Sequence, residues 1–201
     1  MTAQLEFWHE FASTYSYPAA MRIERLAEAA GLTLVWRPFL LGPIFATQGI
    51  NDSPFNIYPV KGRYMWRDLE RICAQEGLPL RQPSAFPRNS ILAARVALVA
   101  VEEGWCNALT PAVYRANFAE DRDIGTREVI GDIVEVLGRP AAAVLERAQS
   151  PPIKERLRAQ TAAAAALGIF GAPSFTIGTE LFWGNDRLEQ AVRWAQREGS
   201  T

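Results

Sequence analysis

One stretch near the end of the chain, residues 168–187, limits the possible folds more than any other part. It reads Gly-Ile-Phe-Gly-Ala-Pro-Ser-Phe-Thr-Ile-Gly-Thr-Glu-Leu-Phe-Trp-Gly-Asn-Asp-Arg and follows an alanine-rich run. Glycine accepts the left-handed backbone conformation in which helices commonly end. Gly168 and Gly171 are therefore expected to close a helix that the alanine-rich run forms.

The rest of this stretch predicts a hairpin followed by a new helix. Residues 174–177 and 180–183 favour short strands around a turn at Gly178 and Thr179. The polar segment 184–186 can cap the helix that follows. A proline stands just before the first strand, where its missing N–H is tolerated, and the Ala172–Pro173 bond is a candidate for the cis form.

The first forty residues predict a strand, a helix and a second strand. Residues 5–9 alternate between a markedly apolar face and a more polar one, which indicates a strand. Apolar residues at helical spacing follow over 19–30, and Gly31 is expected to end that helix. Residues 32–37 read as the second strand, and Pro38 marks its end. This order is a βαβ unit, whose crossover is right-handed.

Hydroxyl side chains gather at the first strand-to-helix transition. Ser13, Thr14 and Ser16 are all able to accept hydrogen bonds from unpaired N–H groups at a helix start. Pro18 is tolerated only in the first turn of that helix. No glycine-rich loop occurs at this junction, which excludes a dinucleotide-binding motif there.

The middle of the chain predicts only helices. Residues 41–58 carry Gly, Pro and Asn throughout and favour a loop. Helical patterns then follow at 64–75, 89–103, 108–119, 126–137, 141–148 and 153–167. Neither end of the chain alone has enough strands for a stable sheet. We therefore expect one α/β layer interrupted by a helical insertion.

Composition and charge exclude several classes of function. A hydrophobic content of 49% and a charged content of 21% over 201 residues are those of an ordinary globular protein. The net charge of −1 and the scattered basic residues give no reason to expect nucleic acid or an anionic membrane as a partner. The N-terminus does not resemble a signal peptide, and no apolar run is long enough to span a bilayer. A cytoplasmic location is the resulting expectation.

Thiol and imidazole side chains are few. Cys73 and Cys106 stand far apart and no Cys-x-x-Cys occurs, which argues against a metal site and against dithiol redox chemistry. Both cysteines are expected in the core. His9 is the only histidine. Its position near Ser13 at the end of a strand suits either a general base or a packed core residue.

Two short motifs carry a family resemblance. The order helix, Gly-x-Pro, hairpin and polar-capped helix resembles the C-terminal half of a thioredoxin-like domain. Residues 170–175 (Phe-Gly-Ala-Pro-Ser-Phe) and 182–187 (Phe-Trp-Gly-Asn-Asp-Arg) are more specific. They resemble 2-hydroxychromene-2-carboxylate isomerases and the related kappa-class glutathione transferases, within the DsbA-like group. The resemblance is strong at 11–18 and 170–188 and looser in the helical middle.

This resemblance implies a fold and a division of the chain. The fold is α/β, with a thioredoxin-like domain that carries a large all-helical insertion. Residues 1–43 and 165–201 are expected to form the thioredoxin-like domain, and residues 44–164 the helical insertion domain.

The resemblance also implies a catalytic residue. Ser13 matches the serine whose hydroxyl donates to the sulfur of glutathione. A helix start favours an anion and lowers the pKa of a thiol held there, and the motif has no cysteine, so an incoming thiol must be the nucleophile. Family members typically read Ser-Pro-aromatic-Ser-Tyr here, whereas this chain has Thr14 in place of the proline.

Further residues are implied in binding. In thioredoxin-like proteins the backbone before the cis-proline pairs with an extended cysteinyl peptide. Asn185 and Asp186 match the residues that hold the γ-glutamyl end, and Asn51 matches a loop position that contacts glutathione. The implied glutathione-binding set is Ser13, Asn51, Ala172, Pro173, Trp183, Gly184, Asn185 and Asp186. The implied substrate-binding set is Tyr15, Ser16 and Lys61, and Lys61 would balance a substrate carboxylate.

The function implied is a glutathione-dependent cis–trans isomerase of an unsaturated aromatic carbonyl acid. Its cofactor would be glutathione and its other partner a small hydrophobic electrophile, with no metal, and the protein would be a homodimer. Two alternatives stay open. One is a kappa-like glutathione transferase, which releases the conjugate as product. The other is a non-catalytic thioredoxin-like module that binds extended cysteinyl peptides.

Overall fold

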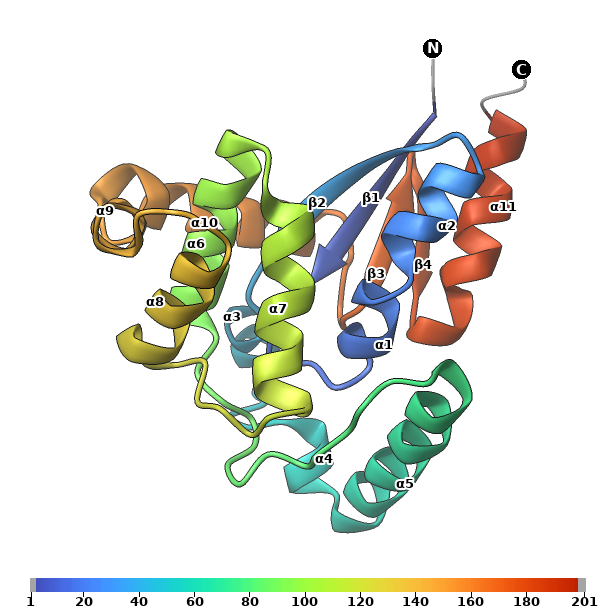
Figure 1. Cartoon of the computed structure of the whole chain (residues 1–201). Coiled ribbons are helices and arrows are strands. Elements are labelled where there is room, and N and C mark those ends of the chain that lie inside the picture. The colour runs from blue at the N-terminus through green and yellow to red at the C-terminus, as the bar shows by residue number, and fades with distance from the viewer. Residues whose placement is uncertain (1–2, 199–201) are drawn as a thin grey trace.

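A four-stranded mixed sheet joins the two ends of the chain in the computed structural model, which describes residues 3–198 (Figure 1). The strands are β1 (Gln4–His9), β2 (Thr33–Pro38), β3 (Ser174–Ile177) and β4 (Glu180–Trp183). Their order across the sheet is β2-β1-β3-β4. Strand β2 runs parallel to β1, whereas β3 is antiparallel to β1 and β4 is antiparallel to β3.

Helices fill the remainder of the chain. Between β1 and β2 lie α1 (Ser16–Ala20) and α2 (Ile23–Ala29). Between β2 and β3 lie α3 (Leu41–Thr47), α4 (Pro54–Ile57), α5 (Pro59–Glu76), α6 (Ile91–Glu103), α7 (Cys106–Phe118), α8 (Arg127–Val136), α9 (Ala141–Ala148) and α10 (Pro151–Ala166). A short 3-10 helix, η1 (Asn185–Arg187), leads from β4 into α11 (Leu188–Glu198). The predicted α/β order, with helices only in the middle, is confirmed.

The helix predicted over residues 19–30 is interrupted, so that prediction was wrong in part. Helix α1 ends at Ala20 and α2 begins at Ile23. In a continuous helix the N–H of Arg22 would donate to the carbonyl of Pro18. Instead this N–H donates to the carbonyl of Ala19, and the Arg22 side chain donates from Nε to the Pro18 carbonyl at 3.3 Å. The side chain thus takes the acceptor that would have continued the helix.

The loop predicted over residues 41–58 contains two short helices, α3 and α4, which corrects the sequence prediction. Pro43 lies in the first turn of α3 and Pro54 is the first residue of α4. Proline is tolerated at these positions because the first N–H groups of a helix have no partner within it. The Ser53 hydroxyl accepts from the N–H of Phe55 at 3.3 Å and caps α4. The residues that suggested a loop are helix starts.

The sheet separates two layers. Leu5 and Phe7 on β1 face the main core, and α2 and α11 lie side by side over that face (Figure 1). Trp8 points to the other face, where it packs in a smaller cluster with Ile44 of α3 and Ala164 of α10. The alternation of residues 5–9 in the sequence therefore separates two packed faces rather than a core face and a solvent face.

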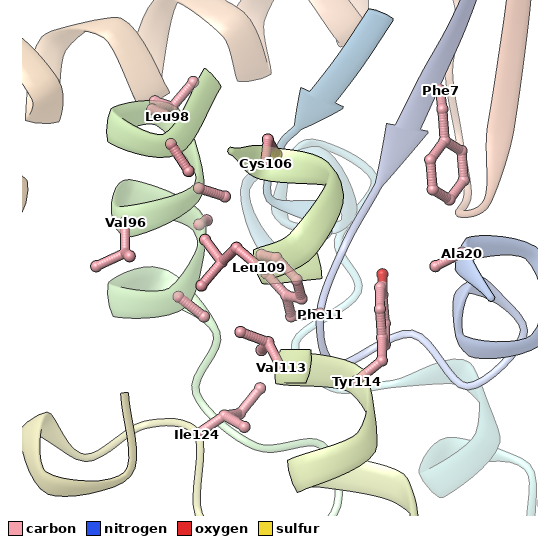
Figure 2. Packing of buried hydrophobic residues seen from close by; sticks show 14 of the residues in the cluster. Phe7, Phe11, Ala20, Val96, Leu98, Cys106, Leu109, Val113, Tyr114 and Ile124 are labelled. Atoms are coloured by element: carbon pink, nitrogen blue, oxygen red, sulfur yellow. The ribbon is translucent and has the colours of Figure 1, made fainter. Parts of the chain in front are cut away.

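The main core continues from the sheet into the helical segment. In Figure 2 the labelled side chains Leu109 and Val113 of α7 lie close to Phe11, and Val96 of α6 belongs to the same buried cluster. The Phe7 ring packs in the same cluster. The division into residues 1–43 with 165–201 and residues 44–164 remains a prediction, and the packing joins both parts in one core.

Both cysteines are buried, as predicted, and both are free thiols. Burial raises the pKa of the Cys73 thiol to about 11 and that of the Cys106 thiol to about 12. Neither is a thiolate at neutral pH. Over residues 3–198 no cluster of three or more His, Cys, Asp or Glu side chains is arranged to hold a metal ion. No helix in this range combines the length and the apolar character needed to cross a membrane.

Candidate functional site

Ser13 and the Ala172–Pro173 peptide meet at one end of the sheet. The pairing of β1 with β3 places Trp8 opposite Ser174, so the chain leaving β1 passes the chain entering β3. The Ser13 hydroxyl donates to the carbonyl of Ala172 at 2.8 Å, and the Ala172–Pro173 bond is cis. Two motifs that are far apart in the sequence therefore meet at one place. There the Ser13 hydroxyl lies beside the backbone of the cis Ala172–Pro173 peptide.

The Ser13 hydroxyl does not cap α1, which corrects the sequence prediction for Ser13, Thr14 and Ser16. Helix α1 has no side-chain cap. Its first turn is closed by backbone bonds, in which the N–H of Ser16 donates to the carbonyl of Ser13 at 3.2 Å. The Ser13 hydroxyl donates to the distant Ala172 carbonyl and does not accept from an N–H of α1. Ser16 and Thr14 are buried.

Two amide N–H groups beside Ser13 remain available. Among residues 3–198, those of Thr14 and Tyr15 donate to no protein acceptor. Unpaired N–H groups at the start of a helix favour an anion. A hydroxyl and two N–H groups thus stand on consecutive residues at the start of α1.

Glu10 supports the backbone that carries Ser13. Its Oε2 accepts from the N–H of Ala12 at 2.9 Å, its Oε1 accepts from the Ser90 hydroxyl, and its carbonyl accepts from the N–H of Ser13 at 3.0 Å. The hydroxyl of Tyr114 on α7, seen in Figure 2 reaching toward β1 and α1, donates to the Glu10 carbonyl at 2.9 Å. Burial raises the pKa of the Glu10 carboxyl to about 7, and its hydrogen bonds oppose that shift. The sequence pattern did not single out Glu10.

Helices α4 and α5 border the site at Tyr15. The Tyr15 hydroxyl donates to Asp68 Oδ2 at 3.0 Å, and its ring centroid lies 6.3 Å from that of Phe55. Burial, and then the hydrogen bond to Asp68, raises the pKa of the Tyr15 phenol. Lys61 is exposed, and its Nζ lies 6.0 Å from the Phe55 ring. The structure therefore connects Tyr15 and Lys61 through Phe55.

Asn51 has no contact that connects it with the other predicted residues in the described part of the chain. It is exposed in the segment between α3 and α4. No hydrogen bond within the described part of the chain ties its side chain to Ser13 or to the Ala172–Pro173 peptide. Its proposed contact with glutathione has no support from the geometry of the free protein.

Trp183 covers the approach to β3. Its ring centroid lies 4.8 Å from that of Phe170, and a Cβ on Gly171 would lie 2.3 Å from its Nε1. Gly168 ends α10 with φ +76°, as predicted. Gly171 does not have a positive φ, so that part of the prediction was wrong. Gly171 instead provides space for the indole.

Gly184 and Asn185 continue the site from β4. The N–H of Gly184 donates to the carbonyl of Pro173 at 2.9 Å, and its φ of +110° suits glycine. Asn185 and Asp186 do not cap the helix, contrary to the sequence prediction. The Asn185 Oδ1 accepts from Arg22 Nη2 at 2.9 Å, whereas Asp186 is exposed and lies 3.3 Å from its neighbour Arg187.

His9 is a core residue. It has no exposed surface, and neither ring nitrogen has a hydrogen-bond partner among the described residues. Its ring stacks on Phe7 at 5.0 Å and packs edge-on against Phe11 and Trp36. Burial lowers the pKa of the imidazole to about 3, so the ring is neutral at neutral pH. Of the two roles that the sequence left open, the packing supports the structural one.

Comparisons with known proteins identify the family of this chain. Residues 4–194 match the DSBA-like thioredoxin domain. The chain is 30% identical over 190 residues to 2-hydroxychromene-2-carboxylate isomerase of Sphingobium xenophagum, which covers 94% of this chain and 96% of that protein. It is 27% identical over 201 residues to glutathione S-transferase kappa 1 of Homo sapiens, which covers 92% and 87%.

A solved structure of 2-hydroxychromene-2-carboxylate isomerase superposes with a TM-score of 0.87 at 28% sequence identity, covering 98% of both chains. The similarity therefore includes the helical segment between β2 and β3 as well as the sheet. The chain belongs to the DSBA-like thioredoxin family, in the group that holds 2-hydroxychromene-2-carboxylate isomerases and kappa-class glutathione transferases.

Proposed function

We propose that this protein is a glutathione-dependent cis–trans isomerase of an unsaturated aromatic carbonyl acid, similar to 2-hydroxychromene-2-carboxylate. One observation carries the proposal: the Ser13 hydroxyl lies 2.8 Å from the Ala172 carbonyl, beside the cis-Pro173 peptide. A hydroxyl donor and a backbone edge for a cysteinyl residue thus occupy one place. The relatives named as isomerases support the class of reaction.

The residues of the site fit glutathione, which is an extended anionic thiol peptide. Ala172 offers a backbone carbonyl for strand-like pairing with a peptide N–H. The N–H of Gly184 donates to the Pro173 carbonyl, so η1 begins next to the Ala172–Pro173 backbone. We assign Asn185 and Asp186 to the γ-glutamyl end, Trp183 to the wall beside the peptide, and Asn51 to the outer side.

Ser13 would change its hydrogen-bond partner when the thiol peptide binds. In the free protein its hydroxyl donates to the Ala172 carbonyl. Once that carbonyl accepts from a peptide N–H, the Ser13 hydroxyl is free to donate to the sulfur. The N–H groups of Thr14 and Tyr15, which donate to no protein atom among the described residues, add two further donors at the same place. Helix α1 has only five residues, so these local donors rather than a long helix dipole would stabilise the thiolate.

When bound, glutathione supplies a thiolate that adds reversibly to the conjugated double bond, so the bond can rotate before elimination returns the thiol. Ser13 would lower the barrier by keeping the sulfur anionic and in place. Tyr15 and Phe55 would offer an aromatic surface for the electrophile, and Lys61 would pair with its carboxylate. Ser16 is buried, so it has no exposed surface to offer the electrophile.

The first prediction tests Ser13. Ser13→Ala removes one donor to a developing or resident anion, and kcat/KM for glutathione-dependent isomerisation should fall by about 100- to 1,000-fold. Steady-state assays with 2-hydroxychromene-2-carboxylate, with and without glutathione, measure this. Thermal melting of the variant serves as the folding control. Absence of glutathione binding to the wild-type protein at millimolar concentration in calorimetry would refute the proposal.

A kappa-like glutathione transferase is the second candidate, because the human kappa-class relative is similar over most of the chain. Accumulation of a stable thioether with a chlorodinitrobenzene-type electrophile would favour it over the isomerase. A non-catalytic peptide-binding module predicts instead that Ser13→Ala leaves cysteinyl-peptide binding unchanged, with no turnover of either compound. A cytoplasmic location, which rests on the sequence, and a homodimer, which rests on the resemblance to the family, remain proposals.

A further inference from the structure

We propose that Arg22 is a positioning residue that fixes the amide of Asn185 and thereby selects thiols with an α-carboxylate at their γ-glutamyl end. This inference rests on the proposed function, because it concerns how the same site recognises glutathione. Neither the sequence motifs nor the family resemblance points to Arg22. It follows from the contacts that its guanidinium makes in the folded chain.

The Arg22 guanidinium connects four elements. Its Nε donates to the Pro18 carbonyl of α1, and its Nη2 donates to Asn185 Oδ1 in η1 at 2.9 Å. Its Nη1 pairs with Glu189 of α11 and lies 3.4 Å from Glu76 at the end of α5. The side chain is 11% exposed. Arg22 therefore has little surface to offer a ligand, and two carboxylates already balance its charge.

The contact with Arg22 decides which way the Asn185 amide faces. A guanidinium donates hydrogen bonds and cannot accept one, so only the amide oxygen can face it. The amide NH2 must then point away from Arg22. Among the described residues Asn185 Nδ2 donates to no protein acceptor, and Asn185 is 7% exposed. Without Arg22 the amide could turn over and present its oxygen instead.

Asn185 and Asp186 then present complementary groups. The Asn185 NH2 is a donor and suits a carboxylate, whereas the exposed Asp186 carboxylate is an acceptor and suits an ammonium group. A donor and an acceptor on adjacent residues match the α-carboxylate and α-amino group of a free amino-acid end. Glutathione has such an end, and simple thiols do not.

The experiment compares thiols that differ only at this end. Wild-type protein and Arg22→Met are assayed with glutathione, with γ-aminobutyryl-cysteinyl-glycine, which lacks the α-carboxylate, and with glutaryl-cysteinyl-glycine, which lacks the α-amino group. In the variant, kcat/KM for glutathione should fall roughly 10- to 100-fold, the value of one hydrogen bond to a charged group. The γ-aminobutyryl thiol should be used equally by both proteins. The glutaryl thiol should still lose activity, because it keeps the carboxylate.

Two further variants keep the test decisive. Arg37→Met removes an arginine that pairs with Glu6, away from Asn185, and should leave the thiol preference unchanged. Asn185→Asp keeps an acceptor for Arg22 but removes the NH2 donor, so it should reproduce the loss even if Arg22→Met folds poorly. Thermal melting reports folding for each variant.

The outcomes separate the two proposals. If wild-type protein shows no glutathione-dependent turnover, the proposed function fails and this inference fails with it. If wild-type protein uses glutathione but folded Arg22→Met loses activity equally with glutathione and the γ-aminobutyryl thiol, Arg22 only supports the fold. Unchanged use of glutathione by folded Arg22→Met would likewise overturn the assignment of Arg22 alone.

Discussion

His9 and Glu10 are adjacent buried titratable residues. Their pKa values shift in opposite directions, so they change the free energy of unfolding with opposite dependence on pH. Burial lowers the pKa of His9 to about 3 and raises that of Glu10 to about 7, because both side chains are more stable neutral in the core. In the unfolded chain these groups titrate near 6.5 and 4.5. The folded and unfolded chains therefore bind different numbers of protons across the acid range, and stability depends on pH.

His9→Phe should change this pH dependence. Below pH 6.5 the unfolded chain binds a proton at His9 that the folded chain does not bind until about pH 3. His9 therefore lowers the free energy of unfolding by about 1.4 kcal/mol per pH unit as the pH falls through this window. Phenylalanine does not bind a proton, so the variant should not lose stability in this way. It also removes the two imidazole nitrogens that have no hydrogen-bond partner among the described residues. Urea denaturation from pH 4 to pH 8 should show the variant gaining stability over wild type as the pH falls.

Glu10→Gln is the matched control, with the opposite sign. The folded chain keeps the Glu10 proton up to about pH 7, whereas the unfolded chain loses it near pH 4.5. Glu10 therefore lowers the free energy of unfolding as the pH rises through that window, and glutamine should abolish the effect. If His9→Phe and wild type had parallel stability profiles from pH 4 to pH 6.5, the interpretation of His9 as a neutral core residue would be wrong.

At the level of helices and strands, the candidate site is formed by the segment that follows β1 and the segment that precedes β3. Ser13 lies in the loop after β1, the cis-Pro173 peptide lies in the turn before β3, and Asn185 lies in η1 after β4. Trp183 at the end of β4 lies over the glycine that precedes this peptide. The position of the indole is therefore coupled to the backbone that we assign to glutathione.

Gly171→Ala tests this coupling. The added Cβ would lie 2.3 Å from Trp183 Nε1, so the indole or the backbone must move. Overpacking of this kind typically destabilises by about 1–3 kcal/mol, and the displaced backbone should weaken glutathione binding by roughly tenfold or more. Calorimetric titration and urea denaturation measure the two effects.

Gly42→Ala in α3 is the control for that change, since a Cβ there would meet no atom within 4 Å. It should leave binding unchanged. Equal glutathione affinity in Gly171→Ala and wild type would mean that Trp183 and the backbone before Pro173 do not belong to the binding site.

At the scale of the whole molecule, a single core joins parts that are distant in the sequence. Residues of the sheet, including Phe7 and Phe175, pack in the same buried cluster as Val96 of α6 and Tyr114 of α7. Tyr114 also reaches the Glu10 carbonyl beside the site. The helical segment thus supports both the sheet and the Ser13 loop.

Replacing residues 44–164 with a short flexible linker should therefore abolish cooperative folding. The truncated chain would expose the sheet residues that now pack against α6 and α7. Circular dichroism during thermal denaturation should show no sharp transition, and a hydrophobic dye should bind, whereas the full chain should melt cooperatively. A truncated chain with a cooperative transition would show that residues 1–43 and 165–201 fold independently.

Local features of the fold could be predicted from the amino acids alone: the order of strands and helices, the hairpin after Pro173 and the helix end at Gly168. These depend on periodicity and on backbone preferences, which act between near neighbours. The resemblance to known proteins added the expectation that Ser13, Ala172 and Pro173 belong to one glutathione-binding set. Residues 41–58 show the limit, because the same prolines suit a loop or the first turn of a helix.

The pairing of the polar groups, in contrast, depends on contacts in the folded chain. Ser13 donates to Ala172 instead of capping α1, Arg22 interrupts a helix by taking a carbonyl within it, and Gly171 makes room for Trp183. For Ser13 a contact with a distant residue replaces a local one, for Gly171 the Trp183 side chain occupies the space, and for Arg22 a side-chain donor competes with the backbone N–H for the Pro18 carbonyl. Local preferences amount to about 1 kcal/mol or less per residue, so burial and long-range hydrogen bonds decide between them, and these exist only once the chain has folded.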